Sequence, residues 1–132
     1  MKKIALIIFF LISGHILCQD KNQFIKIDFT SKCCGTPPEN NMIYFLEDFK
    51  NKNNISKIYG WQICCLGEEG EYALILDLRN FSDKNKQQFK IQMKDLIEEY
   101  NKIYKTTNLG SIIVTYLQTI NQAFYSGKTI QF

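Results

Sequence analysis

Alternation of apolar and polar residues marks three segments of this 132-residue chain. Over residues 24–30 every second side chain is apolar, and a period of two recurs over 58–66 and 72–78. Because successive side chains of a β-strand point to opposite faces, this period predicts three strands that each bury one face. Residues 67–70 are two glycines flanking two glutamates, and such a turn between two strands predicts a β-hairpin.

Apolar residues that recur at intervals of three and four predict two helices. Thr36 and Glu39 have the spacing of a capping box, and Pro37 stands at the first helical position, where its missing N–H is not needed. Residues 51–54 end this helix. Ser82 is the expected N-cap of a longer second helix. Its apolar positions are Phe89, Met93, Leu96, Ile97, Tyr100, Ile103 and Tyr104.

The segment 111–125 has two competing patterns. Its β-branched residues favour a strand, whereas its apolar residues recur at helical spacing and leave threonine and glutamine on the opposite face. Because periodicity is a stronger signal than propensity, we expect a helix here, with a strand as the alternative. Gly127 then ends the helix, and residues 128–132 form a short last strand.

The order of these elements predicts an α+β fold. Strand, helix, two strands, helix, the segment 111–125 and a final strand correspond to the split β-α-β, ferredoxin-like arrangement. We expect a four-stranded sheet with the helices packed on one face. The first two strands would be parallel and joined by a right-handed crossover through the first helix.

Residues 1–18 have the pattern of a secretory signal peptide. Two lysines precede an apolar run over 4–12, which is shorter than the roughly twenty apolar residues that span a bilayer. Its removal leaves a single α+β domain over 19–132. A second interpretation makes Cys18 a lipidated cysteine that anchors the protein to a membrane, although Leu17 stands where a small residue is expected. Both interpretations place the domain outside the cytoplasm, in the periplasm, on the cell surface or secreted.

Removal of residues 1–18 changes the charge of the chain. It takes away two of the sixteen basic residues and none of the thirteen acidic ones, which leaves a net charge of +1. The lysines are interleaved with acids, so the sequence lacks the clustered basic face that binds nucleic acid. We expect another protein as the partner, no nucleic acid and no transmembrane span. Membrane anchoring is expected only through a lipid on Cys18.

The domain over 19–132 contains no histidine, because the only histidine of the chain is His15. Catalytic triads and cysteine–histidine pairs use an imidazole as general base, so these mechanisms are not available to it. A carboxylate-based hydrolase remains an alternative, with Glu68, Glu69 and Asp77 as its candidates, although a solvated turn explains the glutamates better. We expect no catalytic residue, no cofactor, no metal and no enzymatic activity.

Two pairs of adjacent cysteines, Cys33–Cys34 and Cys64–Cys65, are the main chemical feature of the domain. An even number of thiols in an exported chain is typical of disulfides. The pairs follow two parallel strands, so we expect them to meet at one end of the sheet and to form one or two bonds between the pairs. Such a bond closes a loop of about thirty residues and stabilises the fold by roughly 3–4 kcal/mol.

A strand inserted between the two parent strands would make this bond harder to form. The parent strands would then be about 9.5 Å apart, beyond the Cα limit of roughly 7 Å for a disulfide. The glycine-containing loop over 31–35 would have to curl over the end of the sheet.

Two alternatives use the same four thiols. Cys33 and Cys34 precede the first predicted helix, whose dipole lowers a thiol pKa, so a thiol redox protein is the first alternative. Thiol oxidoreductases, however, place two residues between their cysteines, and a bond between adjacent cysteines closes a strained ring. Metal handling is the second alternative. Structural zinc sites, however, usually have about two to four residues between paired cysteines and often include histidine, whereas the cysteines here are adjacent.

Aromatic and acidic residues of the predicted hairpin define a candidate interaction surface. Its members are Tyr59, Trp61, Glu68, Glu69 and Tyr72. Tryptophan and tyrosine are enriched at the energetic centres of protein interfaces, although for Trp61 a place in the helix-packed core is the stronger expectation. The leading hypothesis is a small exported, non-catalytic binding domain stapled by disulfides. A protein-neutralising immunity factor or an envelope accessory protein would be of this kind.

Overall fold

The computed structural model describes residues 22–107, 109–120 and 127–132. Within these residues the chain forms a five-stranded antiparallel sheet and two helices, which confirms the α+β class. In chain order the elements are β1 (Phe24–Phe29), α2 (Asn40–Lys52), β2 (Tyr59–Ile63), β3 (Tyr72–Asp77), α3 (Asp83–Tyr104), β4 (Ile112–Leu117) and β5 (Lys128–Gln131). The predicted signal peptide over 1–18, which includes His15 and Cys18, lies outside the described residues.

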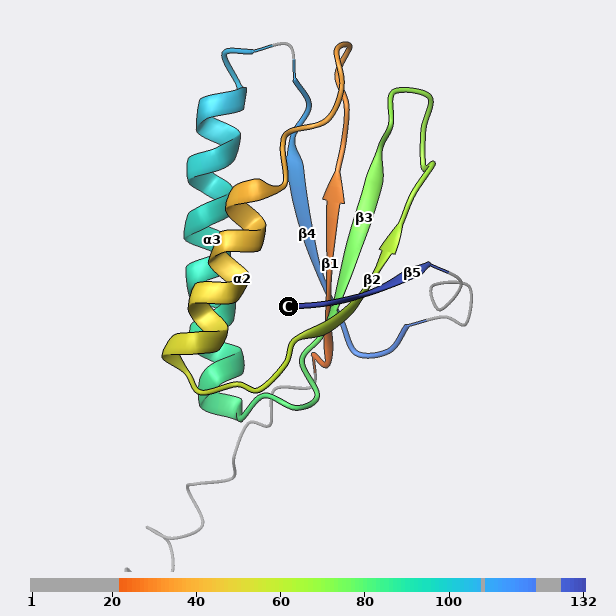
Figure 1. The fold of residues 1–132 in the computed structure, drawn as a ribbon. Helices are drawn as coiled ribbons and strands as arrows, with labels where there is room; N and C mark the ends of the chain where they lie inside the picture. The colour runs from red at the N-terminus through yellow and green to blue at the C-terminus, as the bar shows by residue number, and fades with distance from the viewer. Residues whose placement is uncertain (1–21, 108, 121–126) are drawn as a thin grey trace, which may run out of the picture.

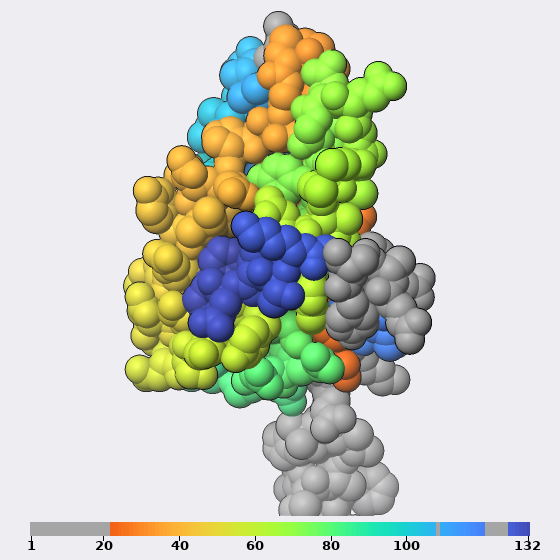
Figure 2. Space-filling model, turned by 45° about the vertical axis from the view of Figure 1, so that its right-hand side comes forward, coloured from red at the N-terminus to blue at the C-terminus, as the bar shows by residue number. Residues whose placement is uncertain are grey.

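The strands lie in the order β4-β1-β3-β2-β5, and each neighbouring pair is antiparallel. β1 and β2 therefore run in the same direction, as predicted, but β3 lies between them. Both helices cover the same face of the sheet (Figure 1). β5 pairs with β2 and lies at the surface beside α2 (Figure 2). The prediction of four strands is wrong, because β4 adds a strand on the outer side of β1.

The hydrophobic core fills the space between the helices and one face of the sheet. Ile25 of β1 is paired with Leu76 of β3, and both side chains are fully buried beneath the helices. Aromatic contacts join the two helices to each other, with the ring centroids of Phe49 and Phe89 4.9 Å apart in an edge-to-face arrangement. The helices contribute Met42, Leu46, Phe49, Phe89, Met93, Ile97 and Tyr100 to this core.

The start of α3 and the β2–β3 hairpin follow the sequence pattern. The Ser82 hydroxyl accepts a hydrogen bond from the Asn85 N–H at 3.2 Å, which confirms the predicted N-cap. The hairpin is closed by the Leu66 N–H, which donates to the Glu71 carbonyl oxygen at 3.0 Å.

α2 begins later than predicted. Its first residue is Asn40, and Glu39 occupies the N-cap position without a side-chain hydrogen bond that caps the helix. The predicted capping box at Thr36 is therefore wrong. The reason is local, because Pro37 precedes Pro38 and a residue before proline is disfavoured in the helical conformation.

Residues 112–117 form the strand β4, so the prediction of a helix over 111–125 is wrong where the structure describes this segment. Residues 121–126 lie outside the described part. β4 pairs with β1 along its whole length, from Phe24 opposite Leu117 to Phe29 opposite Ile112. A backbone that runs beside an unpaired strand edge gains a full ladder of hydrogen bonds, and this gain outweighs the helical spacing of the apolar side chains.

A side-chain amide from α3 connects the start of β4 to the helix layer. The Ile112 N–H donates to Asn101 Oδ1 at 2.9 Å, and Asn101 Nδ2 donates to the Ile112 carbonyl oxygen at 2.8 Å. The amide thus makes the two hydrogen bonds that a neighbouring strand would make. It fixes the end of β4 relative to α3.

Replacement Asn101→Ala is expected to lower the free energy of unfolding by about 1–3 kcal/mol, because it leaves the N–H and carbonyl of Ile112 without these bonds. Asn101→Asp keeps the acceptor but not the donor, so it should lose less free energy of unfolding than Asn101→Ala. Urea denaturation of both variants measures the effect. Lys102→Ala, at the exposed position next to it, is the control and should change stability by no more than about 0.5 kcal/mol. Equal stabilities of Asn101→Ala and the control would contradict this role.

Candidate functional site

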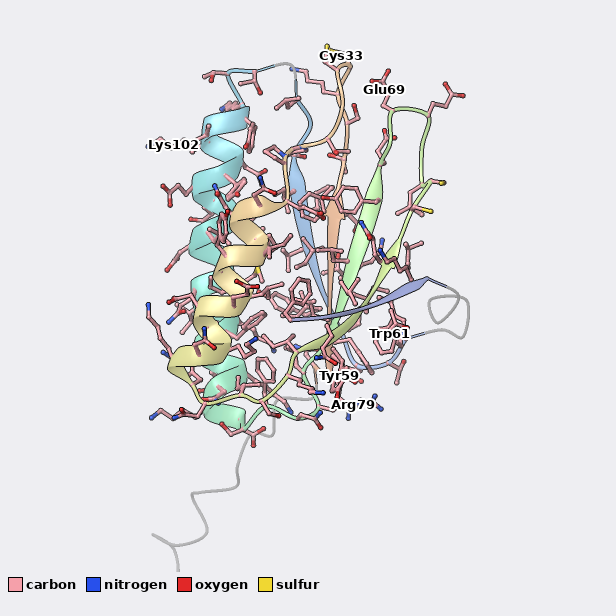
Figure 3. The ribbon with its side chains drawn as sticks, viewed as in Figure 1. Cys33, Tyr59, Trp61, Glu69, Arg79 and Lys102 are labelled. Carbon is pink, nitrogen blue, oxygen red and sulfur yellow. The ribbon has the colours of Figure 1, made fainter. Side chains whose placement is uncertain are left out.

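The residues of the predicted interaction surface lie in different places. Figure 3 shows Tyr59 and Trp61 near Arg79 toward one end of the sheet, and Glu69 at the opposite end. Tyr72 belongs to the helix-covered side of the sheet, where it packs against the core. The structure therefore brings Tyr59 and Trp61 together and separates the other residues from them.

Trp61 faces away from the helices. Its neighbour Gly60 is paired with Leu76, whose side chain belongs to the core, so the residues that alternate with Gly60 point to the other face. The expectation that Trp61 packs against the helices is therefore wrong. The helix-covered side carries Ile58, just before β2, and Gly60 within it, and both are buried.

Tyr72 is half-buried and stacks on Phe29, with ring centroids 4.5 Å apart and an angle of 8° between the rings. Burial raises the pKa of the Tyr72 phenol above its ordinary value of 10.0. The negative charge of Glu39 and a hydrogen bond to this carboxylate raise the pKa further. The neutral phenol is thus part of the packing, and the Tyr72 side chain stays partly exposed.

Glu68 and Glu69 are exposed at the tip of the hairpin. The Glu69 carboxylate accepts a hydrogen bond from the Ser31 hydroxyl at 3.5 Å, and the Glu69 N–H donates to the Glu71 carboxylate at 3.0 Å. The first contact connects the hairpin tip to the β1–α2 loop, and the second lies within the hairpin. The exposure of both glutamates is typical of a solvated turn.

A depression surrounds Tyr59 and Trp61 on the face without helices. Its volume is about 450 Å³, within the range of small-ligand pockets. Trp61 is half-buried and Tyr59 is 38% exposed, so both rings present surface to it. The lining residues are Tyr59, Gly60, Trp61, Asp77, Arg79, Asn80 and Thr129.

An ion pair between Arg79 and Asp77 forms the charged side of this depression. Arg79 Nη2 donates to Asp77 Oδ2 at 2.6 Å, Arg79 Nε donates to Oδ1 at 2.9 Å, and the Arg79 backbone N–H donates to Oδ1 at 2.9 Å. Asp77 is 8% exposed, so its charge needs such donors. The guanidinium also lies over the ring of Phe24, 5.1 Å from its centroid. Arg79 is therefore fixed before any partner binds.

Sequence reasoning missed Arg79 and Thr129. Asp77 is a carboxylate at a buried position of an apolar strand, and Arg79 two residues later is the nearest basic residue in the chain. That combination was a usable signal, because a buried charge requires a partner. Thr129 had no such signal, since its place opposite Trp61 depends on the pairing of β5 with β2.

The carboxylates of the predicted hydrolase are not brought together. Asp77 is engaged with Arg79, while Glu69 lies at the other end of the sheet from Arg79 (Figure 3). General acid–base catalysis by two carboxylates needs both groups at one bond, so this arrangement does not support it.

The four described cysteines are exposed, and none of them is in a disulfide. The β1–α2 loop and the hairpin that carry them lie at the same end of the molecule, as predicted (Figure 1). The predicted disulfide between the pairs is nevertheless wrong for this structure, because β3 separates β1 from β2. Instead the sulfur atoms approach within each pair, at 2.9 Å for Cys33 and Cys34 and 3.2 Å for Cys64 and Cys65.

Each pair raises the pKa of one of its own thiols. The pKa of Cys33 is raised above 9.0 mainly by the hydrogen bond with Cys34, and that of Cys65 mainly by the hydrogen bond with Cys64. The lowered thiol pKa expected beside a helix N-terminus is therefore wrong for Cys33. The helix begins only at Asn40, beyond the reach of a dipole that falls off within one turn.

Over residues 22–107, 109–120 and 127–132, no group of three or more histidine, cysteine, aspartate or glutamate side chains is arranged to hold a metal ion. Neither helix in this part of the chain combines the length and apolar character needed to cross a bilayer. No family model, curated protein or solved structure matches the chain.

The raised pKa of Tyr72 predicts a loss of stability in alkali. Because its phenol stays neutral in the folded state, ionisation above pH 10 favours the unfolded state, and the stability that Tyr72 contributes is fully present only below that pH. Between about pH 9 and about pH 11, Tyr72→Phe should lose less unfolding free energy than wild type. The difference should be about 1 kcal/mol, since the ring is only half-buried.

Urea denaturation at several pH values measures this difference. Tyr44→Phe is the matched control, because Tyr44 is 66% exposed on α2. It should follow the wild-type pH profile. Identical profiles for Tyr72→Phe and Tyr44→Phe would contradict the prediction.

Proposed function

We propose that this chain is a small exported, non-catalytic binding domain that recognises another protein through the depression at Trp61. One observation carries this proposal: Trp61, Tyr59 and Arg79 line a single concave site. Tryptophan, tyrosine and arginine are the three residue types most enriched at the energetic centres of protein interfaces. An immunity-type protein that neutralises another protein, or an envelope accessory protein, would use such a surface.

The rigidity of the site supports this proposal. Arg79 is held by four hydrogen bonds from its own atoms to Asp77, and Trp61 lies within a paired strand between Ile75 and Thr129. Association is opposed by the loss of side-chain freedom, which is small for groups that are already ordered. The ion pair also leaves the depression close to neutral, which favours an apolar or aromatic anchor side chain from the partner.

We also propose that the fold is a ferredoxin-like core with one added strand. The order β4-β1-β3-β2, the direction of its strands and the position of both helices on one face support this assignment, with β5 as an extension beyond β2. The arrangement does not choose a function, because one fold can host many unrelated sites.

The second candidate function is thiol redox chemistry at the adjacent cysteines. It is favoured by the approach of the two sulfur atoms within each pair and by their exposure to solvent. The metal-handling form of this alternative has weaker support, since two sulfurs supply only half of a tetrahedral zinc shell.

The binding function predicts that Trp61→Ala loses its partner. Tagged full-length protein should capture a stoichiometric protein from the extracytoplasmic fraction of the cells that produce it. Truncation of an interface hot spot costs at least about 2 kcal/mol, so Trp61→Ala should weaken the complex by about thirtyfold. Trp61 is the only tryptophan in the chain, so its fluorescence should also shift when the purified partner is added.

Tyr44→Ala is the matched control, because it removes an aromatic ring that is 66% exposed on α2. It should retain the partner at wild-type affinity. Trp61→Phe serves as a second variant if Trp61→Ala unfolds, and its far-UV circular dichroism should match that of wild type. Equal affinities of the Trp61 variants and wild type, or capture of no stoichiometric partner, would overturn the proposal.

A further inference from the structure

The cysteines of each adjacent pair are placed to react with each other. The Sγ atoms of Cys33 and Cys34 are 2.9 Å apart, and those of Cys64 and Cys65 are 3.2 Å apart. A disulfide bond is about 2.05 Å long, so a sulfur displacement of about 1 Å would close either pair. We propose that the two pairs are independent redox sites, each of which forms a disulfide between neighbouring residues when it meets a small-molecule disulfide.

The backbone explains how neighbouring thiols can meet. In a regular strand, adjacent side chains point to opposite faces, which would keep Cys64 and Cys65 apart. β2, however, ends at Ile63, and Cys65 has a φ of 61°, in the left-handed region that residues with a side chain rarely occupy. The chain therefore leaves strand geometry at this pair. The other pair lies in the loop before Gly35, which has a φ of 100°.

The topology opposes the competing bonds between the pairs. Because β3 separates β1 from β2, the two parent strands are about 9.5 Å apart, beyond the Cα limit of roughly 7 Å. The β1–α2 loop does approach the hairpin, but it does so through Ser31 and Glu69. Glu69 lies at the tip of the hairpin, past the cysteines at the end of β2.

The reaction is a two-step thiol–disulfide exchange. The thiolate of one cysteine attacks a sulfur of the oxidant, which forms a mixed disulfide and releases one small-molecule thiolate. The neighbouring thiolate then attacks the cysteine sulfur of the mixed disulfide and releases the second. The protein loses two electrons and two protons, and one small-molecule disulfide becomes two thiols. All four cysteines are exposed, so the oxidant has access to both pairs.

Disulfides between adjacent cysteines differ from structural disulfides, which connect distant parts of a chain. Adjacent Cα atoms are about 3.8 Å apart, less than the usual range of about 4.4–6.8 Å across a disulfide, so the small ring is strained and is reduced readily. The ring encloses no intervening residue and hardly restricts the unfolded chain. The proposal therefore describes reversible redox sites. It rests on the second candidate function, which it makes specific, and it does not depend on the binding function.

Tryptic peptide mapping distinguishes a disulfide within each pair from a disulfide between the two pairs. Cleavage at lysine and arginine places the first pair on the peptide 33–50 and the second on the peptide 58–79, and neither peptide contains an internal cleavage site. The reduced full-length protein is incubated with oxidised glutathione at about pH 9, because thiol–disulfide exchange requires a thiolate. Free thiols are then blocked, and the digest is analysed by mass spectrometry without reduction.

The expected result is two separate peptides, each lighter by two hydrogens than its reduced form. A cross-linked species of 33–50 with 58–79 would overturn the proposal. Fully reduced peptides, or glutathione adducts that persist, would overturn it as well. None of these outcomes changes the binding test at Trp61, so the two proposals can fail separately.

A double variant and a melting experiment complete the test. In Cys64→Ser/Cys65→Ser, Cys33 and Cys34 should be oxidised as completely as in wild type, whereas bonds between the pairs could no longer form. Oxidised and reduced wild type should differ in Tm by less than about 3 °C, because no chain loop is closed. A fall in Tm of about 10 °C or more on reduction would indicate a disulfide between the two pairs and would overturn the proposal.

Discussion

Burial of the central strand β3 is the constraint on which the rest of the structure depends. It has a hydrogen-bonded strand on each side, and residues 73–78 are all buried. A carboxylate in such a strand needs a partner, because its charge would otherwise be desolvated without compensation. Arg79 supplies the partner for Asp77 just after the strand ends, and its guanidinium also lies over Phe24. Burial of β3 thus determines where the fixed charge beside Trp61 is located.

The position of β3 also separates two chemistries in space. It keeps β1 and β2 apart, so the cysteines that follow these strands approach their own neighbours instead of each other. Cys33 lies at the opposite end of the sheet from Trp61 and Arg79 (Figure 3). A change at the Cys33–Cys34 pair therefore occurs far from the aromatic depression (Figure 3), whereas Cys64 follows Trp61 by three residues in the chain.

The spacing of apolar residues alone was enough to locate the elements that bury only one face. β1 and α3 were predicted for this reason, and the Ser82 cap was visible as a single residue before an apolar helix face. Residues 112–117 were mispredicted because side-chain spacing does not report a free strand edge, and β1 offers one. The late start of α2 at Asn40 was within reach of the sequence, since Pro37 precedes Pro38.

The chain alone was enough to predict the local periods, the α+β class, the adjacent cysteine pairs and the aromatic residues Tyr59 and Trp61. These follow from short-range chemistry, which depends on neighbours in the chain. Three features required the folded chain: Trp61 faces away from the helices, Thr129 lies opposite it, and β3 separates the strands that precede the cysteine pairs. The reason is that strand order and register are set by long-range backbone pairing, and a shift of one residue turns every side chain to the other face.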